Sequence, residues 1–187
     1  YASFYREAGP SVVLAQIDTA ASTPDTLYRL DMDLGKGPAR SNAYALDVRT
    51  HWYNYYLAHL DNGREIVPAY NQLVYPDAFE GIDVQIMNTT PQPNYNFLVR
   101  PGADPDDIEL EFSGHDSIYI NGNGDLILET AIGNWVLPQP DAMLTDSTNS
   151  VSPTAWNPTW SLSLNVASIS TGSYDTTKQL VLGVGDG

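Results

Sequence analysis

The sequence predicts an all-β protein, an antiparallel β-sandwich of about ten strands with little helix. Short segments alternate apolar and polar side chains, which is the period of a strand with one buried face. Turns rich in glycine and proline separate them, and the chain has 14 glycines and 13 prolines. Aromatic residues make up 11% of the 187 residues, and the 12 tyrosines suit strands.

Two strands are expected near the start of the chain, at 11–17 and 27–34. Residues 41–56 fit either a strand or a helical turn, and the pattern leaves both open. Residues 66–74 continue in an extended conformation, and Pro68 within them indicates a sheet edge or a bulge, because proline cannot donate to a ladder.

The clearest pattern lies in residues 79–114, which predict a three-stranded meander. Apolar and polar side chains alternate in three runs, at 82–87, 95–100 and 108–113. Two prolines break the ladder within 88–94, because proline lacks a donor and fixes φ. Residues 101–105 (PGADP) predict a rigid turn, after which Asp106 and Asp107 fit a short capped turn.

The C-terminal part predicts a hairpin and three more strands. In the hairpin at 117–129, Ile118 and Ile120 face Leu126 and Leu128 across an Asn-Gly-Asn-Gly-Asp loop. Further strands are expected at 132–137, 160–169 and 179–184. Residues 141–158 are rich in Asp, Ser, Thr, Asn and Pro and predict a long ordered loop or linker, with the loop itself at 145–158.

Composition disfavours several classes of partner. The net charge of −15, from 23 acidic and 8 basic residues, repels nucleic-acid phosphates and anionic membranes. No apolar run approaches the roughly 18 residues that span a bilayer, so membrane insertion is not expected. The chain has no cysteine, which excludes thiol catalysis, thiolate metal sites and disulfides. The last six residues (LGVGDG) break off abruptly, so 1–187 is expected to be one domain of a larger multidomain protein.

A long composite pattern runs through the chain. Its pieces are NYYLAH at 54–59, DNGR at 61–64, VPAY at 67–70, GIDV at 81–84, FLV at 97–99, PGADP at 101–105 and FSG at 112–114. In order and spacing it resembles the uncharacterised all-β domain that precedes SBBP-type β-propeller repeats in large secreted surface proteins of Bacteroidota, exported by type IX secretion. The resemblance covers 26–184 and transfers no catalytic residues.

The resemblance implies a non-enzymatic module that lies outside the cell or on its outer surface, with a structural or adhesive role. The partners that it implies are neighbouring domains of the same polypeptide or neighbouring copies. Surface proteins of these bacteria are O-glycosylated at Asp-Ser/Thr followed by a small aliphatic residue, Met or Thr. The chain has five such triplets, whereas composition predicts roughly one.

The expected acceptor hydroxyls for O-glycans are those of Thr19, Thr26, Ser117, Ser147 and Thr176. Asp-Thr and Asp-Ser are also ordinary turn pairs, so a purely structural interpretation stays open.

Two oxygen-rich turns are weak candidates for Ca²⁺, which binds where carboxylates and carbonyls converge. Their residues are Asp104, Asp106 and Asp107 in one turn and Asn121, Asn123 and Asp125 in the other. The second turn lacks the glycine and the glutamate of an EF-hand, and a tight hairpin explains it without metal. No other cofactor is expected.

An enzyme is not expected. Ser113, His115 and Asp116 are nearly adjacent and cannot converge from separate elements as a catalytic triad must. The alternative to a scaffold is a carbohydrate-binding module, with Trp156 in the long loop as the side chain that stacks on a sugar. Trp135 and Trp160 lie in strand patterns and are expected in the core.

Overall fold

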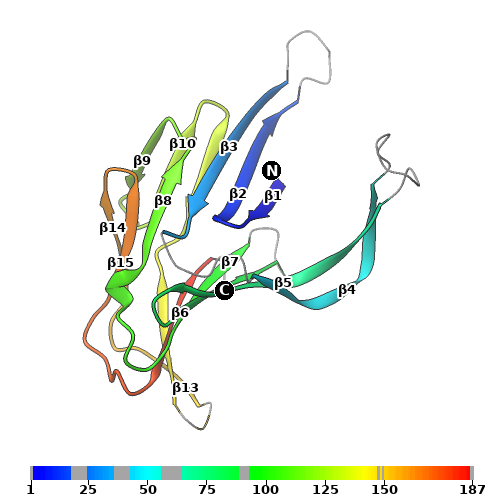
Figure 1. Ribbon diagram of the computed structural model, residues 1–187. Coiled ribbons are helices and arrows are strands. Elements are labelled where there is room, and N and C mark those ends of the chain that lie inside the picture. The colour runs from blue at the N-terminus through cyan, green and yellow to red at the C-terminus, as the bar shows by residue number, and fades with distance from the viewer. Residues whose placement is uncertain are drawn as a thin grey trace.

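The computed structural model consists almost entirely of antiparallel strands, which confirms the predicted all-β class (Figure 1). The structure describes residues 2–17, 25–35, 43–55, 65–88, 93–146, 148 and 150–185. Sixteen strands form within these ranges, more than the ten or so expected. The described residues contain no helix that is long and apolar enough to cross a membrane.

The strands form three sheets. The six-stranded sheet has the order β1 (Ala2–Arg6), β2 (Gly9–Gln16), β3 (Thr26–Asp33), β8 (Glu109–Ser113), β15 (Val166–Ser170), β14 (Thr159–Ser163). The seven-stranded sheet has the order β13 (Val151–Pro153), β12 (Asp141–Thr145), β16 (Gln179–Val184), β7 (Asn94–Val99), β6 (Ile82–Met87), β5 (Glu65–Phe79), β4 (Tyr44–Tyr55). The small sheet has the order β11 (Gly133–Leu137), β10 (Leu126–Thr130), β9 (Ser117–Ile120).

One continuous apolar core joins the sheets. The alternating side chains of the predicted meander supply its centre, each 2% exposed or less: Ile82, Val84, Ile86, Tyr95, Phe97, Val99, Ile108, Leu110 and Phe112. Trp135 of the small sheet contacts both larger sheets. Its ring centroid lies 5.9 Å from that of Phe112 in β8 and 6.5 Å from that of Tyr95 in β7. The small sheet therefore closes the sandwich.

The third strand of the predicted meander lies in the opposite sheet, which corrects the expectation. β6 and β7 pair with each other, but β8 pairs with β3 and β15. Between β7 and β8 the chain makes the predicted rigid turn, where the amide of Gly102 donates to the carbonyl of Thr176 at 3.0 Å. The short 3₁₀ helix η2 (Pro105–Asp107) follows, and this segment carries the chain from one sheet to the other.

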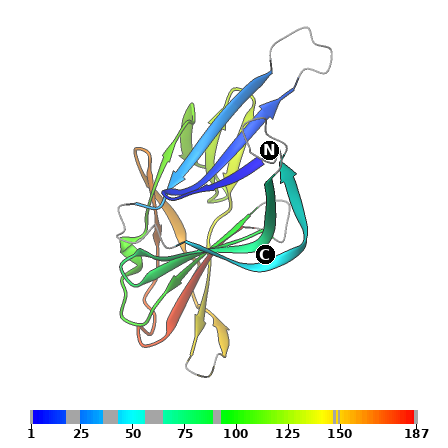
Figure 2. The ribbon, with the colours of Figure 1, turned by 45° about the vertical axis from the view of Figure 1, so that its right-hand side comes forward.

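Residues 41–56, where the pattern left strand and helical turn open, contribute the long strand β4. β4 pairs with β5, and the register shifts between Val48 and Trp52, which stands opposite Pro68. The structure therefore has a bulge beside Pro68, one of the two features that this proline predicted, because proline cannot donate to the ladder. Figures 1 and 2 show β4 and β5 curving away from the rest of their sheet.

The predicted hairpin at 117–129 is confirmed in its register, with Ile120 opposite Leu126 and Ile118 opposite Leu128. The run predicted as one strand at 160–169 is instead two strands, β14 and β15, joined by a turn at Leu164. Leu164 has a φ of 53° and is 89% exposed. The alternating pattern did not predict this turn, because the apolar residue Leu164 occupies it and continues the alternation of a strand.

The segment predicted as a long loop contains two strands. β12 pairs with β16 in the seven-stranded sheet, and β13 pairs with β12 at its edge. Ala142 is buried in β12, whereas every residue of β13 is exposed. Polar residues are compatible with an edge strand. Pro153, which has no backbone donor, is tolerated there because no strand that the structure describes pairs with the outer side of β13.

Candidate functional site

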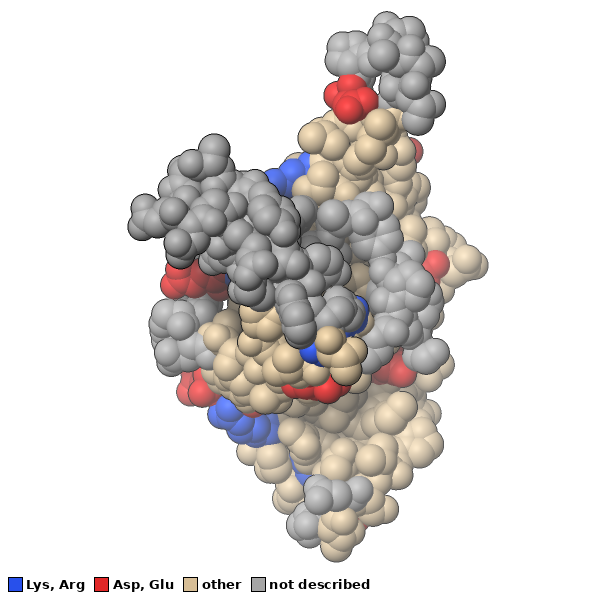
Figure 3. All heavy atoms as spheres, turned by 90° about the vertical axis from the view of Figure 1, so that its right-hand side faces the viewer, with Lys and Arg blue, Asp and Glu red and all other residues tan. Residues whose placement is uncertain are grey.

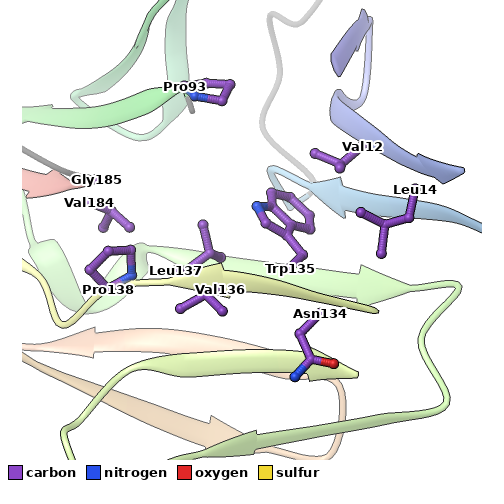
Figure 4. A pocket seen from close by; sticks show the side chains of 10 residues that line it. All are labelled: Val12, Leu14, Pro93, Asn134, Trp135, Val136, Leu137, Pro138, Val184 and Gly185. Atoms are coloured by element: carbon purple, nitrogen blue, oxygen red, sulfur yellow. The ribbon is translucent and has the colours of Figure 1, made fainter. Parts of the chain in front are cut away.

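An apolar cavity of about 70 Å³ lies beside Trp135. Figure 4 shows the indole between Val12 and Leu14 of β2 on one side and Leu137 of β11 on the other. Asn134 supplies a polar side chain at its border. A cavity of this size and lining holds at most a very small apolar group. None of the described residues that line it is an acid, a base or a nucleophile.

The turn before β8 holds the first candidate calcium ligands. The Asp104 carboxylate accepts a hydrogen bond at 3.0 Å from the amide of Asp106 and so caps η2. Asp106 and Asp107 are exposed. Burial, followed by the charges of Asp104 and Asp106, raises the pKa of Tyr174, whose side chain borders this turn. Among the described residues, no three His, Asp or Glu side chains converge in a way that could hold a metal.

The second candidate turn is closed by its own side chains. Asn121 Oδ1 accepts from the amides of Asn123 at 2.8 Å and Asp125 at 3.0 Å. Asn121 Nδ2 donates to Asp125 Oδ2 at 2.9 Å, and Asp125 Oδ1 accepts from the amide of Gln139 at 3.1 Å. These contacts agree with the metal-free hairpin interpretation, and calcium binding at either turn stays a prediction.

Trp156 is half-buried rather than fully open to a ligand. Its Nε1 donates to the carbonyl of Ser173 at 3.1 Å, and its ring lies 6.5 Å from that of Tyr174. The ring packs so closely on Gly172 that an added Cβ would lie 2.6 Å from it. Trp156 therefore braces the 171–174 segment, and only part of its surface is available for stacking on a sugar.

The other two tryptophans that the structure describes at side-chain level lie in the core, as predicted. Trp135 is 7% exposed and Trp160 is 6% exposed. The Nε1 of Trp160 donates to the carbonyl of Pro138 at 2.9 Å, which satisfies its one polar atom.

The Ser113–Asp116 segment makes a tight turn. Gly114 has a φ of 88°, and a Cβ there would lie 2.0 Å from the carbonyl oxygen of Arg29. The Asp116 carboxylate accepts from the amide of Ala131 at 2.9 Å. The segment therefore lies close against β3 at Arg29 and is bonded to the turn at Ala131.

The candidate glycan acceptors differ in access. Thr26 and Thr176 are exposed. Ser117 is half-buried, and its hydroxyl donates to Glu129 at 2.7 Å. Thr19 and Ser147 lie outside the described residues.

Two of the aspartates in these triplets close turns. Asp175 Oδ1 accepts from the amide of Thr177 at 3.0 Å and from its hydroxyl at 2.6 Å. Asp146 Oδ1 accepts in the same way from Thr148, at 2.8 Å and 2.6 Å. The side-chain bonds from these threonines, aided by the backbone bonds, lower the pKa of both carboxyls. Because Asp175 binds Thr177, the hydroxyl of Thr176 is not part of this contact.

A second hollow, with a volume of about 380 Å³, lies where β1 approaches the curved β4–β5 pair. We call it the Arg49 hollow and define it by Tyr5, Arg49, Pro68, Tyr70, Gln72 and Asn88. Sequence reasoning missed it because its residues come from β1, β4 and β5 and from the end of β6, and β4 lies in the segment left open between strand and helical turn. Arg49, one of 8 basic residues in an acidic chain, was a signal that could have indicated it.

The fold and these sites define an antiparallel β-sandwich with polar, hydrogen-bonded turns. A family model described as "Domain of unknown function (DUF7948)" matches residues 4–182, and the chain belongs to this family. Comparison with curated proteins and with solved structures gives no match.

Proposed function

We propose that this domain is a non-enzymatic structural or adhesive module of a large secreted protein, located outside the cell or on its outer surface. The observation that carries the proposal is that polar side chains in the candidate sites form hydrogen bonds within turns. Carboxylates and amides that could serve chemistry instead accept hydrogen bonds within turns: Asp104, Asn121, Asp125, Asp146 and Asp175. Aspartate and asparagine side chains that bond to nearby backbone amides fix the conformation of a turn.

The core supports the same role. A single apolar cluster runs through all three sheets, so the domain is expected to unfold as one cooperative unit. The resemblance to domains of secreted Bacteroidota surface proteins supports the location. Under this proposal the partners are neighbouring domains of the same polypeptide or neighbouring copies of it.

The location is tested by brief protease treatment of intact cells that make the parent protein. Peptides from residues 26–184 are expected in the released fraction, together with those of known surface proteins and without cytoplasmic markers. Recovery of these peptides only after cell lysis would refute the proposed location.

Covalent O-glycans are part of the proposal, with Thr26 and Thr176 as the acceptors that exposure favours most. The intact mass of the native protein is expected to exceed the sequence mass in sugar-sized steps. Thr176→Ala is expected to remove one such step. Ser173→Ala, in the same segment but without a preceding aspartate, is the control and is expected to remove none. A native mass equal to the sequence mass would refute glycosylation.

A carbohydrate-binding module is the second candidate function. The half-buried position of Trp156 and its bond to Ser173 weaken the case for that residue as the main stacking surface. The observation that favours carbohydrate binding lies instead in the Arg49 hollow.

A further inference from the structure

The walls of the Arg49 hollow are held by contacts between the two large sheets. The hydroxyl of Tyr5 in β1 donates to Asn88 Oδ1 at 2.5 Å, just beyond the end of β6. The hydroxyl of Tyr75 in β5 donates to the carbonyl of Arg6 at 2.7 Å. These bonds fix β1 against the seven-stranded sheet, so the hollow exists before any ligand arrives. A volume of about 380 Å³ falls within the range of small-molecule sites.

Arg49 is bound differently from the other arginines whose side chains the structure describes. Arg6 and Arg29 contact Asp31, and Arg100 contacts Asp77 and Asp83. Arg49 instead donates from Nε to Asn71 Oδ1 at 2.5 Å and from Nη2 to the carbonyl of Asn88. In the described part of the chain, both of its hydrogen-bond partners are therefore neutral.

Hydrogen bonds link Arg49 to the carboxylate of Asp47 through an intervening side chain, that of Asn71. Asp47 Oδ2 accepts from Asn71 Nδ2 at 2.7 Å, so Asn71 stands between the two charges. The guanidinium is thus held in one orientation by amide and carbonyl oxygens, and no carboxylate among the described residues contacts it directly. A half-buried cation in this arrangement favours an anion supplied by a ligand, and guanidinium pairs best with a carboxylate or phosphate.

The remaining groups of the hollow suit a sugar. Tyr70 lines the hollow with an aromatic ring that ends in a hydroxyl, and it is 36% exposed. Gln72 and Asn88 are planar amides of the kind that bind hydroxyl groups. Among the described residues on the face that Figure 3 shows, basic atoms lie in small groups with acidic atoms near them. This distribution fits one carboxylate rather than a densely charged polyanion.

We propose that the Arg49 hollow binds a carboxylate-bearing sugar, a uronic acid, with the carboxylate on Arg49 and the sugar ring against Tyr70. The proposal gives the adhesive role a ligand class and in that respect rests on the proposed function. The two are tested separately, because binding by the isolated domain is measured without reference to where the parent protein lies.

The experiment titrates the domain with galacturonic acid, which carries one carboxylate, and with its methyl ester, which removes the negative charge and keeps the sugar. Calorimetry at about 0.15 M salt limits the repulsion from the net charge of −15, because the Debye length is then about 8 Å. The acid is expected to bind at least about tenfold more tightly than the ester, since hydrogen bonds to charged groups exceed neutral ones by about that factor.

The variants assign the binding to the hollow. Arg49→Gln is expected to weaken binding of the acid about tenfold or more and to remove the difference between acid and ester. Tyr70→Ala, on the rim, is expected to weaken acid and ester alike. Arg29→Gln, which removes an arginine whose side chain is 57% exposed and paired with Asp31, is the control and is expected to leave both affinities unchanged.

Because Arg49 also bonds to Asn71 and Asn88, the melting temperature of each variant is measured alongside. Tyr70→Ala keeps the proposal testable if Arg49→Gln does not fold. Four results would overturn the proposal: no binding of the acid, equal affinity for acid and ester, unchanged affinity in folded Arg49→Gln or Tyr70→Ala, or preference for a peptide carboxylate over the sugar acid.

Discussion

Replacing Trp135 with alanine tests whether one side chain couples the three sheets. Trp135 is 7% exposed and makes ring contacts with Phe112 of the six-stranded sheet and Tyr95 of the seven-stranded sheet. Removing a buried tryptophan costs about 3–5 kcal/mol. The upper half of that range is expected here, because each aromatic contact adds about 0.5–1.5 kcal/mol beyond its buried area.

The surroundings of Trp135 also argue for a large effect. The cavity of about 70 Å³ beside the ring indicates that the neighbouring side chains do not close existing space, so the new void is expected to persist. A cavity that cannot collapse adds about 24 cal/mol per Å³ to the loss. For a chain of this size, 3–5 kcal/mol lowers the melting temperature by about 6–20 °C.

The assay is denaturant unfolding followed by circular dichroism, which does not depend on the removed fluorophore. Val136→Ala is the matched control, because Val136 is the next residue of the same strand and is 37% exposed. Its loss is expected to stay near 0.5 kcal/mol, as at most surface positions. A loss below about 1 kcal/mol in Trp135→Ala would refute the coupling argument, and so would separate unfolding of the small sheet.

Three further predictions address the turns and an ion pair. Gly114→Ala is expected to cost at least about 2 kcal/mol in denaturant unfolding, since its φ of 88° is strained for alanine and a Cβ would lie 2.0 Å from a backbone oxygen of β3; a neutral substitution would contradict the close approach. Burial raises the pKa of Asp31, but hydrogen bonds from Ser11 and Arg29 and the nearby arginine charges outweigh it, so the net pKa is lowered from 3.8. A lowered pKa stabilises the fold above the unfolded value and loses that stabilisation as pH falls through the folded value. Melting curves below about pH 4 should therefore fall more steeply in the parent domain than in Asp31→Asn, and parallel curves would contradict this. Asn121→Asp is expected to lower the melting temperature more than Asn123→Asp, because it replaces an amide donor with a carboxylate facing that of Asp125; equal losses would contradict the assigned bonds.

Local chemistry made much of the fold predictable. The alternation over 82–87 identified Ile82, Val84 and Ile86 as buried, because side chains on a strand point to opposite faces in turn. The Asn-Gly-Asn-Gly-Asp loop set the register of the hairpin between β9 and β10, because a short loop leaves few ways to pair its flanking strands. Both features depend on residues close together in the sequence.

The candidate sites were less predictable for the opposite reason. The residue types in the turns at 104–107 and 121–125 are the same for a metal site and for a hydrogen-bonded turn. Only the positions of hydrogen-bond donors, such as the amides of Asp106 and Gln139, indicate that these side chains serve hydrogen-bonded turns. The Arg49 hollow joins Tyr5, Arg49 and Asn88 across more than 80 residues of sequence, and no local pattern brings them together.

The sequence by itself determined that this chain forms paired strands with one buried face, where many of them turn, and that its core is aromatic and aliphatic. The tertiary structure decided which sheet each strand joins and how Trp135 connects the sheets. For example, β8 follows β7 in the chain but pairs with β3 in the other large sheet. The physical reason is that alternation encodes only which side of a strand is apolar. The partner of that side is chosen by the packing of the whole core.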